Sequence, residues 1–199
     1  MNTNNRWLQL IDENPDHSAS YIQRFKDMEA EGRDLDGEAR LIDAMVKRNS
    51  RILDAGCGPG RVGGVLHRMG HDVVGVDLDP ALIAAAEHDH PGPRWITADL
   101  AYLDVEGAFD AVVCAGNVVT FLSPETRVSV LTRLGNHLAD TGRIVIGFGA
   151  GREYEFSDFR IDVAASGLEI ELELSTWDVR PFTAESGFLV AVLRHRDRA

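Results

Sequence analysis

The sequence predicts an α/β protein built on a doubly wound sheet with helices on both faces. From residue 51 onward, short runs rich in Val and Ile alternate with helical patterns, as in a parallel sheet with helical crossovers. Those runs are almost wholly apolar, as strands buried on both faces require. Near the C-terminus the pattern changes to strict alternation. We therefore expect about seven strands, mostly parallel, with an antiparallel pair at the C-terminal end.

Seven segments have the composition of strands. Residues 168–174 alternate between apolar side chains and Glu, which is typical of a strand with one face in water. Residues 188–193 form a continuous apolar run, and the loop 178–187 joins these two into the antiparallel pair. The expected parallel strands are 51–55, 73–77, 94–98, 110–115 and 143–148.

Helices between the strands have their own start signals. Asp79 precedes Pro80, a capping carboxylate before a proline that suits the first helical position. Ser123 precedes Pro124 in the same way and begins a helix that we expect to run to about Ala139. Its apolar side chains recur at three- and four-residue steps and predict a stripe that packs on the sheet: Val128, Leu131, Leu134 and Leu138.

The chain is expected to form a single domain over residues 1–199. Its length and its 44% hydrophobic residues fit one domain with a substantial core. Residues 1–50 contain two helical segments, 18–31 and 36–47, which either form a lid or simply pack. Residues 51–148 form the central sheet, and residues 149–199 supply a further helix and the antiparallel strands. The N-terminal position suits a lid, but packing explains it equally well.

Composition excludes several classes of partner. The formal net charge is −12, and no run of Lys and Arg exceeds the pair Lys47 and Arg48, so nucleic acid is not an expected partner. No apolar stretch has the length of a membrane span or a secretory signal, which predicts a cytoplasmic protein that does not bind membranes. The seven His and two Cys show no ligand spacing, so we expect no metal. The oligomeric state is left open.

A glycine-rich loop follows the first strand. Residues 54–60 read Asp-Ala-Gly-Cys-Gly-Pro-Gly, with a strand before them and a helical segment after them. Ligands of open α/β sheets bind at the carboxyl ends of the strands, where glycine lets the backbone turn sharply and approach a ligand. The dinucleotide pattern G-x-G-x-x-G fits poorly, because counting from Gly56 leads to Arg61, and counting from Gly58 leads to Gly60 and Gly63 but leaves the acidic strand end out of its usual place. A carboxylate at Asp54 is unfavourable beside a pyrophosphate and favourable beside an ammonium or sulfonium group.

The stretch from Ile52 to Asp99 resembles the class I S-adenosylmethionine-dependent methyltransferases, which have a Rossmann-like sheet. The family's D-x-G-x-G-x-G loop matches Asp54, Gly56, Gly58 and Gly60. The resemblance implies that Asp77, at the end of the second strand, accepts hydrogen bonds from both ribose hydroxyls. A helix-capping role is the alternative for Asp77.

Two further strand ends carry the resemblance. It implies that Asp99 accepts from the adenine amine while the backbone amide of Leu100 meets the ring, although Asp99 can also cap a turn. The fourth strand ends beside the position of the methionine moiety and the reacting sulfur. The residues implied there are Ala115, Gly116 and Asn117, and a turn role is the alternative for Asn117. Leu78, which follows Asp77, is also expected in the cofactor site, and it completes the set.

The resemblance implies transfer of a methyl group from S-adenosylmethionine by in-line displacement. Such a reaction needs chiefly a well-placed nucleophile, so neither a base nor a covalent intermediate is required. The acceptor is expected to be a small molecule, because residues 115–118 do not match the Asn-Pro-Pro-Tyr type used on amide and base nitrogens. Its pocket is expected between the N-terminal segment and residues 116–122, 152–154 and 178–187.

Several N-terminal side chains are candidates around the reacting sulfur. Asn117 and Tyr21 are candidates to orient the substrate or the methyl group, and Trp7, Tyr21 and Phe25 either face the sulfonium or only pack. Arg24 and Arg40 are candidate partners of the cofactor carboxylate, with a surface role as the alternative. Two other functions stay open: a non-catalytic sensor or scaffold that binds S-adenosylmethionine, and, more remotely, an NAD-dependent reductase.

Overall fold

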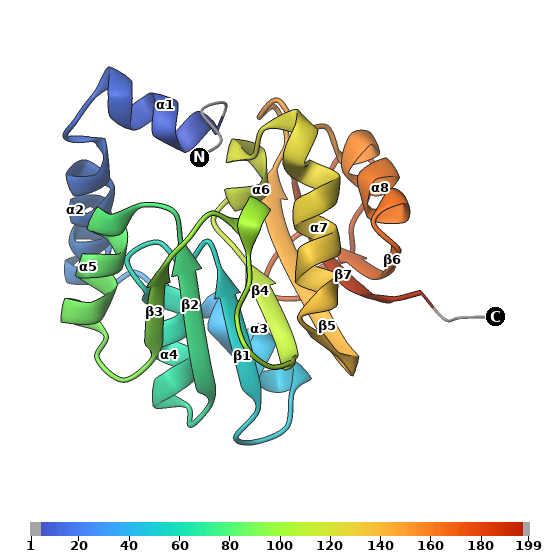
Figure 1. Ribbon diagram of the computed structural model, residues 1–199, viewed down its shortest axis with the longest axis horizontal. Coiled ribbons are helices and arrows are strands. Elements are labelled where there is room, and N and C mark those ends of the chain that lie inside the picture. Colours follow the sequence, from blue (N-terminus) through green and yellow to red (C-terminus); the bar gives the residue numbers. More distant parts are fainter. Residues whose placement is uncertain (1–4, 197–199) are drawn as a thin grey trace.

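The computed structural model describes residues 5–196, in which one seven-stranded sheet runs through the centre (Figure 1). Residues 1–4 and 197–199, which belong to the expected N- and C-terminal parts of the domain, lie outside the described residues. The strands follow the order β3-β2-β1-β4-β5-β7-β6. They are β1 (Arg51–Ala55), β2 (Asp72–Asp77), β3 (Arg94–Thr97), β4 (Phe109–Cys114), β5 (Leu138–Gly149), β6 (Leu168–Leu174) and β7 (Phe188–His195).

The sheet confirms the predicted fold class. Strands β1 to β5 run parallel to one another, and β7 is antiparallel to both β5 and β6. The chain order reverses beside β1, where β1 has β2 on one side and β4 on the other. In doubly wound sheets a ligand crevice forms at this switch point, at the carboxyl ends of the strands.

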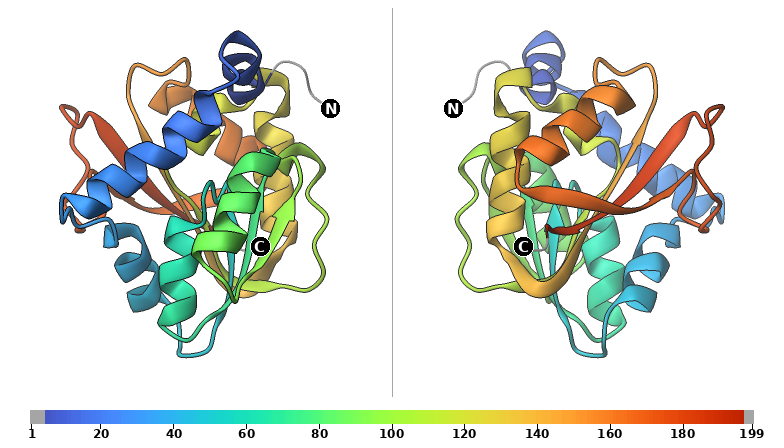
Figure 2. Two further views of the ribbon diagram at one scale, coloured as in Figure 1. Left: turned by 90° about the vertical axis from the view of Figure 1, so that its left-hand side faces the viewer. Right: turned by 90° about the vertical axis from the view of Figure 1, so that its right-hand side faces the viewer.

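Helices cover both faces of the sheet, as predicted (Figures 1 and 2). One hydrophobic cluster joins Leu53 of β1 to Leu134 of α7 and Phe159 of α8. The other joins the neighbouring Ile52 to Ile42 of α3 and Leu66 of α4. The helices are α1 (Arg6–Glu13), α2 (His17–Ala30), α3 (Gly37–Met45), α4 (Arg61–Arg68), α5 (Pro80–Asp89), α6 (Val118–Phe121), α7 (Arg127–Asn136) and α8 (Phe156–Ala165). Within residues 5–196, no helix is long and apolar enough to cross a membrane.

One helix prediction was wrong in part, and one helix was not predicted. The helix expected to reach Ala139 ends at Asn136 in α7, and Leu138 begins β5 by pairing with Phe109 of β4. An apolar side chain at that spacing suits either element, and sheet pairing decides between them. Helix α1 has no counterpart among the predicted helices. Asn5 is the N-cap of α1, and its side-chain oxygen accepts a hydrogen bond from the Trp7 amide at 2.9 Å.

The side chain of Trp95 explains why three glycines cluster beside the first two strands. Trp95 is buried between β2 and helices α4 and α5, with its ring against Gly75, Gly63 and Gly60. A Cβ atom on Gly75 would lie 2.2 Å from that ring, and a Cβ atom on Gly63 would lie 2.8 Å from it. The close contact between strand and helix therefore requires glycine here, independently of any ligand.

We predict that Gly75→Ala destabilises the protein by roughly 1–3 kcal/mol, the usual cost of overpacking a core. Denaturant unfolding followed by circular dichroism measures this loss. Gly37→Ala is the matched control, because its added Cβ would meet its nearest neighbours at an ordinary 3.8 Å. Equal stability of the two variants would contradict the packing role of Trp95.

Candidate active site

A cleft opens at the carboxyl edge of the parallel strands, where the loops after β1, β2, β3 and β4 meet. Its empty volume is about 540 Å³. The floor consists of Gly56, Gly58, Asp77, Leu78, Leu82, Asp99, Leu100, Gly116 and Val118, and the N-terminal segment and helix α6 supply Asn5, Trp7, Tyr21, Phe121 and Leu122. Parallel strands bring these distant segments together, because all their carboxyl ends lie at the same edge.

A smaller cavity of about 350 Å³ continues past Tyr21. It shares Tyr21, Gly56, Gly58 and Gly116 with the cleft, and adds Asp54, Arg61 and Ala115 among other residues. Tyr21 thus stands between the two compartments. Together they form one elongated site that runs from Asp99 to Arg61.

Asp77 is a buried carboxylate at the floor of the cleft, with 8% of its surface exposed. Its Oδ2 accepts from the Gly58 amide at 2.9 Å, and its Oδ1 accepts from the Asp79 amide at 3.0 Å. Burial raises the pKa of Asp77 to about 6, and the two amides oppose that shift. The group is therefore mostly ionised at neutral pH, and each oxygen has lone pairs left for a ligand hydroxyl.

Asp54 lies under the glycine loop with only 2% of its surface exposed. Its Oδ2 accepts from the amide of Gly63 at 2.8 Å, in the first turn of α4. The N-cap of α4 is Gly60, which has no side chain to satisfy that amide, so Asp54 supplies the acceptor from the neighbouring strand. Burial raises the pKa of this carboxyl to about 7.

The three loop glycines serve different purposes. All have positive φ: +79° at Gly56, +55° at Gly58 and +84° at Gly60. A Cβ on Gly56 would strike Val118 at 2.5 Å, and one on Gly60 would strike Ala86 at 2.8 Å. A Cβ on Gly58 would instead point toward Tyr21 at 3.7 Å. Gly58 therefore keeps the cleft open, whereas the other two permit close packing of the protein itself.

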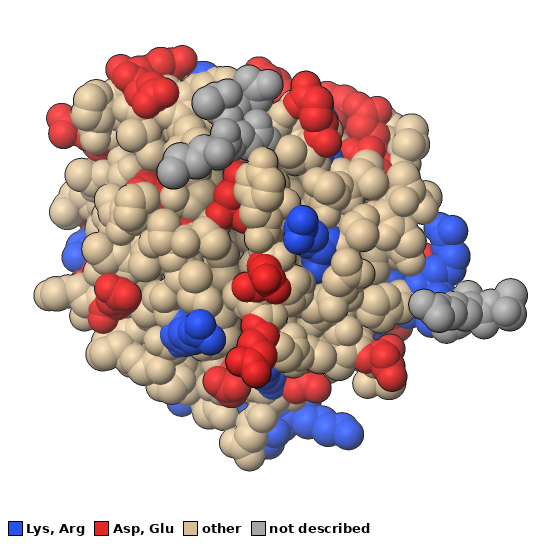
Figure 3. Space-filling model, viewed as in Figure 1, with Lys and Arg blue, Asp and Glu red and all other residues tan. Residues whose placement is uncertain are grey.

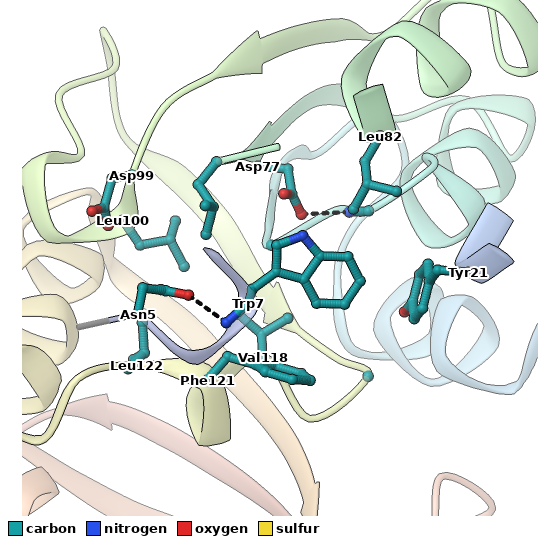
Figure 4. Close-up of a pocket in the computed structure, with 14 residues that line it drawn as sticks. Asn5, Trp7, Tyr21, Asp77, Leu82, Asp99, Leu100, Val118, Phe121 and Leu122 are labelled. Carbon is teal, nitrogen blue, oxygen red and sulfur yellow. Dashed lines mark hydrogen bonds between the residues drawn. The ribbon is translucent and has the colours of Figure 1, made fainter. Parts of the chain in front are cut away.

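Aromatic side chains form the roof of the cleft. Figure 4 shows the Trp7 indole in the middle of the lining residues, with Asp99 on one side and Tyr21 on the other. The Trp7 ring makes edge contacts with Tyr21 at 5.0 Å and Phe121 at 5.5 Å between ring centroids. Helices α1 and α2 carry Trp7 and Tyr21, so the N-terminal segment covers the cleft and lies against it.

Comparison with known proteins identifies the family. A family model described as a methyltransferase domain matches residues 52–142. The crystal structure of a TehB-like S-adenosylmethionine-dependent methyltransferase from Corynebacterium glutamicum superposes with a TM-score of 0.89 at 49% identity, over 92% of this chain and 100% of that one. The chain belongs to the class I S-adenosylmethionine-dependent methyltransferases. Its cofactor is S-adenosylmethionine.

Two curated relatives are more distant and longer. The magnesium-protoporphyrin O-methyltransferase of Rhodobacter capsulatus is 33% identical over 122 residues, which are 57% of this chain and 53% of that protein. The malonyl-[acyl-carrier protein] O-methyltransferase of Enterobacter lignolyticus is 27% identical over 48% of this chain and 37% of that protein. The chain thus spans about half the length, or less, of the curated relatives it matches. Family membership disfavours the alternative of an NAD-dependent reductase.

Most of the residues singled out from the methyltransferase motifs come together in this site. The cleft contains Gly56, Gly58, Asp77, Leu78, Asp99, Leu100, Gly116 and Tyr21, and the adjoining cavity contains Asp54 and Ala115. Asp99 also caps the turn at residues 100–102, because its Oδ1 accepts from the Ala101 amide at 2.9 Å. The site thus has carboxylates beside apolar side chains, a combination that fits a cofactor with a ribose, a planar base and a cationic sulfur.

The three other candidate residues make their contacts with other groups of the protein. The Asn117 Oδ1 accepts from the Gly149 amide at 2.8 Å, so this side chain ties the end of β4 to the end of β5. Arg40 is exposed and forms two hydrogen bonds with Asp34, at 2.8 and 2.6 Å. The exposed Arg24 lies over the ring of Tyr21, with its guanidinium carbon 4.8 Å from the centroid.

The expectation that residues 152–154 border the substrate pocket was wrong for Tyr154. Its side chain is buried in the core, where the ring stacks on Phe148 and the hydroxyl donates to Asp162 at 2.7 Å. The ring packs against apolar side chains of β5 and α8, which favours its burial in the core. Sequence position alone places it after β5 but does not give its direction.

Arg61 is a site residue that the sequence did not single out. Its guanidinium lies in the smaller cavity and forms two hydrogen bonds with Glu38 of α3, at 3.0 and 2.6 Å. It also lies over the ring of Phe25, at 5.4 Å from the centroid. Its position directly after Gly60 was the available signal, because the first residue of a helix that follows a glycine loop lies close to the ligand.

The buried Asp54 makes stability depend on pH. Its pKa rises from the ordinary 3.8 to about 7 on folding, so the folded state binds the proton more tightly. The resulting stabilisation is complete below about pH 4 and is lost as the pH rises through 7. We predict that the advantage of the wild type over Asp54→Asn, measured by urea unfolding without cofactor, is smaller at pH 8 than at pH 5, by roughly 2–3 kcal/mol. A difference between the two proteins that stays constant with pH would contradict this.

Proposed function

We propose that this methyltransferase transfers a methyl group from S-adenosylmethionine to a small-molecule acceptor, and that residues 1–199 act as one domain. The observation that carries the proposal is the cover over the cleft. Its floor is the carboxyl edge of the sheet, and Trp7, Tyr21 and Phe121 lie over it, so a ligand at this edge has protein on both sides. A polymer would require an open groove at this edge.

The side chains along the cleft determine the proposed orientation of the cofactor. Asp77 would accept hydrogen bonds from the ribose hydroxyls, and Asp99 would accept from the adenine amine. The apolar side chains of Leu78, Leu82 and Leu100 line the same part of the cleft and suit the two faces of a planar base. Strand ends β2 and β3 thus supply the adenosine half of the proposed site.

The methionine half would lie past Tyr21, between the glycine loop and the end of β4. Gly58 and Gly116 leave room there, because a Cβ on either would meet only the Tyr21 ring or hydroxyl, at 3.7 and 3.8 Å. S-adenosylmethionine supplies a methyl group on a positively charged sulfur, and the Asp77 carboxylate, which is mostly ionised at neutral pH, makes the potential here more negative. Arg61 is better placed than Arg24 or Arg40 to meet the cofactor carboxylate, since it already lines this cavity.

Tyr21 would orient the acceptor and would not act as a base. Burial raises the pKa of its hydroxyl, and the nearby Arg24 and Arg61 only partly oppose that shift. The hydroxyl is therefore neutral at physiological pH and can donate or accept a hydrogen bond. In-line displacement then depends on position and angle, which the roof residues supply.

The net charge and one of the two curated relatives support a small acceptor. The chain carries a formal net charge of −12, and Figure 3 shows its basic side chains in separate groups among acidic ones on that face. Such a surface does not attract a polyanion. The Rhodobacter capsulatus relative is named for a porphyrin, which is a small molecule. The cytoplasmic location stays a prediction from the sequence.

Asp77→Asn tests the cofactor assignment. Loss of a charged acceptor costs about 1.5–3 kcal/mol, so we expect S-adenosylmethionine to bind at least tenfold more weakly, as measured by calorimetry. Asp72→Asn is the matched control, because it makes the same change on the same strand at an exposed position.

The acceptor class is tested by transfer of a labelled methyl group to a panel of small molecules, RNA and proteins. Transfer confined to the polymers would overturn the small-molecule proposal.

Tyr21→Phe tests the orienting role of the hydroxyl. The ring remains in place, so we expect cofactor affinity within twofold of the wild type and a kcat about tenfold lower, the scale of one misplaced hydrogen bond. Because the hydroxyl stays protonated, the pH profile of kcat between pH 6 and 9 should keep its shape. Tyr102→Phe, at an exposed position, is the control. An unchanged kcat in Tyr21→Phe would rule out the role.

A further inference from the structure

Asp79 is a buried carboxylate that the proposed cofactor contacts do not use. It lies two residues after Asp77, with 3% of its surface exposed, and caps helix α5 through a hydrogen bond from the Ala81 amide to its Oδ1 at 2.8 Å. Its second oxygen accepts two more hydrogen bonds, from Trp7 Nε1 at 3.0 Å and from Ser18 Oγ at 2.5 Å. A helix cap needs only the first of these three bonds.

The two additional donors belong to the roof of the cleft. Trp7 lies on α1 in the middle of the lining residues (Figure 4), and Ser18 lies in the first turn of α2, one turn before Tyr21. Asp79 therefore holds both roof helices at one point. Hydrogen bonds to an ionised acceptor, shielded from water, are among the stronger ones that a protein makes.

A continuous series of hydrogen bonds leads from this point to the glycine loop. The backbone amide of Asp79 donates to Asp77 Oδ1 at 3.0 Å, and the amide of Gly58 donates to Asp77 Oδ2 at 2.9 Å. The segment Asp77–Asp79 thus faces the cleft with its first carboxylate and the roof with its last. The two carboxylates are thus connected through the backbone amide of Asp79.

We infer that Asp79 is a positioning residue that couples cofactor binding at Asp77 to closure of α1 and α2 over the cleft. The inference rests on the assignment of Asp77 to the ribose. A docked roof holds Trp7 and Tyr21 against the occupied site, so the cofactor leaves only after the bonds to Asp79 open. By linkage, a bound cofactor holds the roof closed to the same extent.

Asp79→Asn separates this role from helix capping. Asn is an equally good N-cap and keeps an oxygen for the Ala81 amide, but its NH₂ group faces the indole N–H of Trp7 in place of an acceptor. Trp7→Phe and Ser18→Ala remove one donor each from the other side. Ser20→Ala is the matched control, because Ser20 is exposed on the same helix.

The experiment measures the dissociation rate of S-adenosylmethionine and the amide hydrogen exchange of α1 and α2, with and without saturating cofactor. We expect Asp79→Asn and Trp7→Phe to raise the dissociation rate about tenfold and to reduce the protection that the cofactor gives to both helices. Ser18→Ala should have a smaller effect in the same direction, and Ser20→Ala should match the wild type.

Wild-type dissociation and wild-type protection in Asp79→Asn, or in Trp7→Phe and Ser18→Ala together, would overturn the inference and leave Asp79 as a helix cap. Asp77→Asn keeps this failure distinct from failure of the proposed site. If Asp77→Asn weakens cofactor binding while the Asp79 and roof variants do not, only the coupling is overturned. If Asp77→Asn binds like the wild type, the ribose assignment is overturned as well.

Discussion

Two buried carboxylates fix the glycine loop, and the rest of the site depends on them. Asp54 accepts from the Gly63 amide and Asp77 from the Gly58 amide, so the first turn of α4 and the middle of the glycine loop are each tied to a strand. Burial works against both charges, as the raised pKa values of the two groups show. The protein thus keeps two carboxyl groups buried at the proposed cofactor site, although their burial disfavours the charged form.

Packing, and not only ligand contact, explains the glycines of this motif. Gly60 and Gly63 admit the ring of Trp95, Gly56 admits Val118, and only at Gly58, of the three loop glycines, would an added Cβ point toward Tyr21 in the cleft. The loop therefore holds its shape through contacts on its protein side. A preformed loop loses little conformational freedom on binding, which favours affinity.

The N-terminal helices complete the site from far away in the sequence. Trp7 and Ser18 reach Asp79, while Glu38 reaches Arg61 at the other end of the glycine loop. These polar contacts join the N-terminal helices to the carboxyl edge of the sheet, alongside the aromatic contact of Trp7 with Phe121.

The sequence by itself determined the sheet, its mixed character and the acids at the strand ends. Apolar runs, glycine turns and capping signals act over a few residues, so their meaning is local: residues 51–55 and 168–174 form the expected strands. The same local signals misplaced Leu138, because its apolar side chain suits a helix stripe as well as a strand.

Only the tertiary structure decided which side chains meet. Asn117 turns to Gly149, Tyr154 enters the core, and Arg61 joins Glu38 across 23 residues of chain. The contact of Asp79 with Trp7 spans 72 residues. No sequence period encodes such pairs, because they depend on how helices and strands far apart in the chain pack at one edge of the sheet.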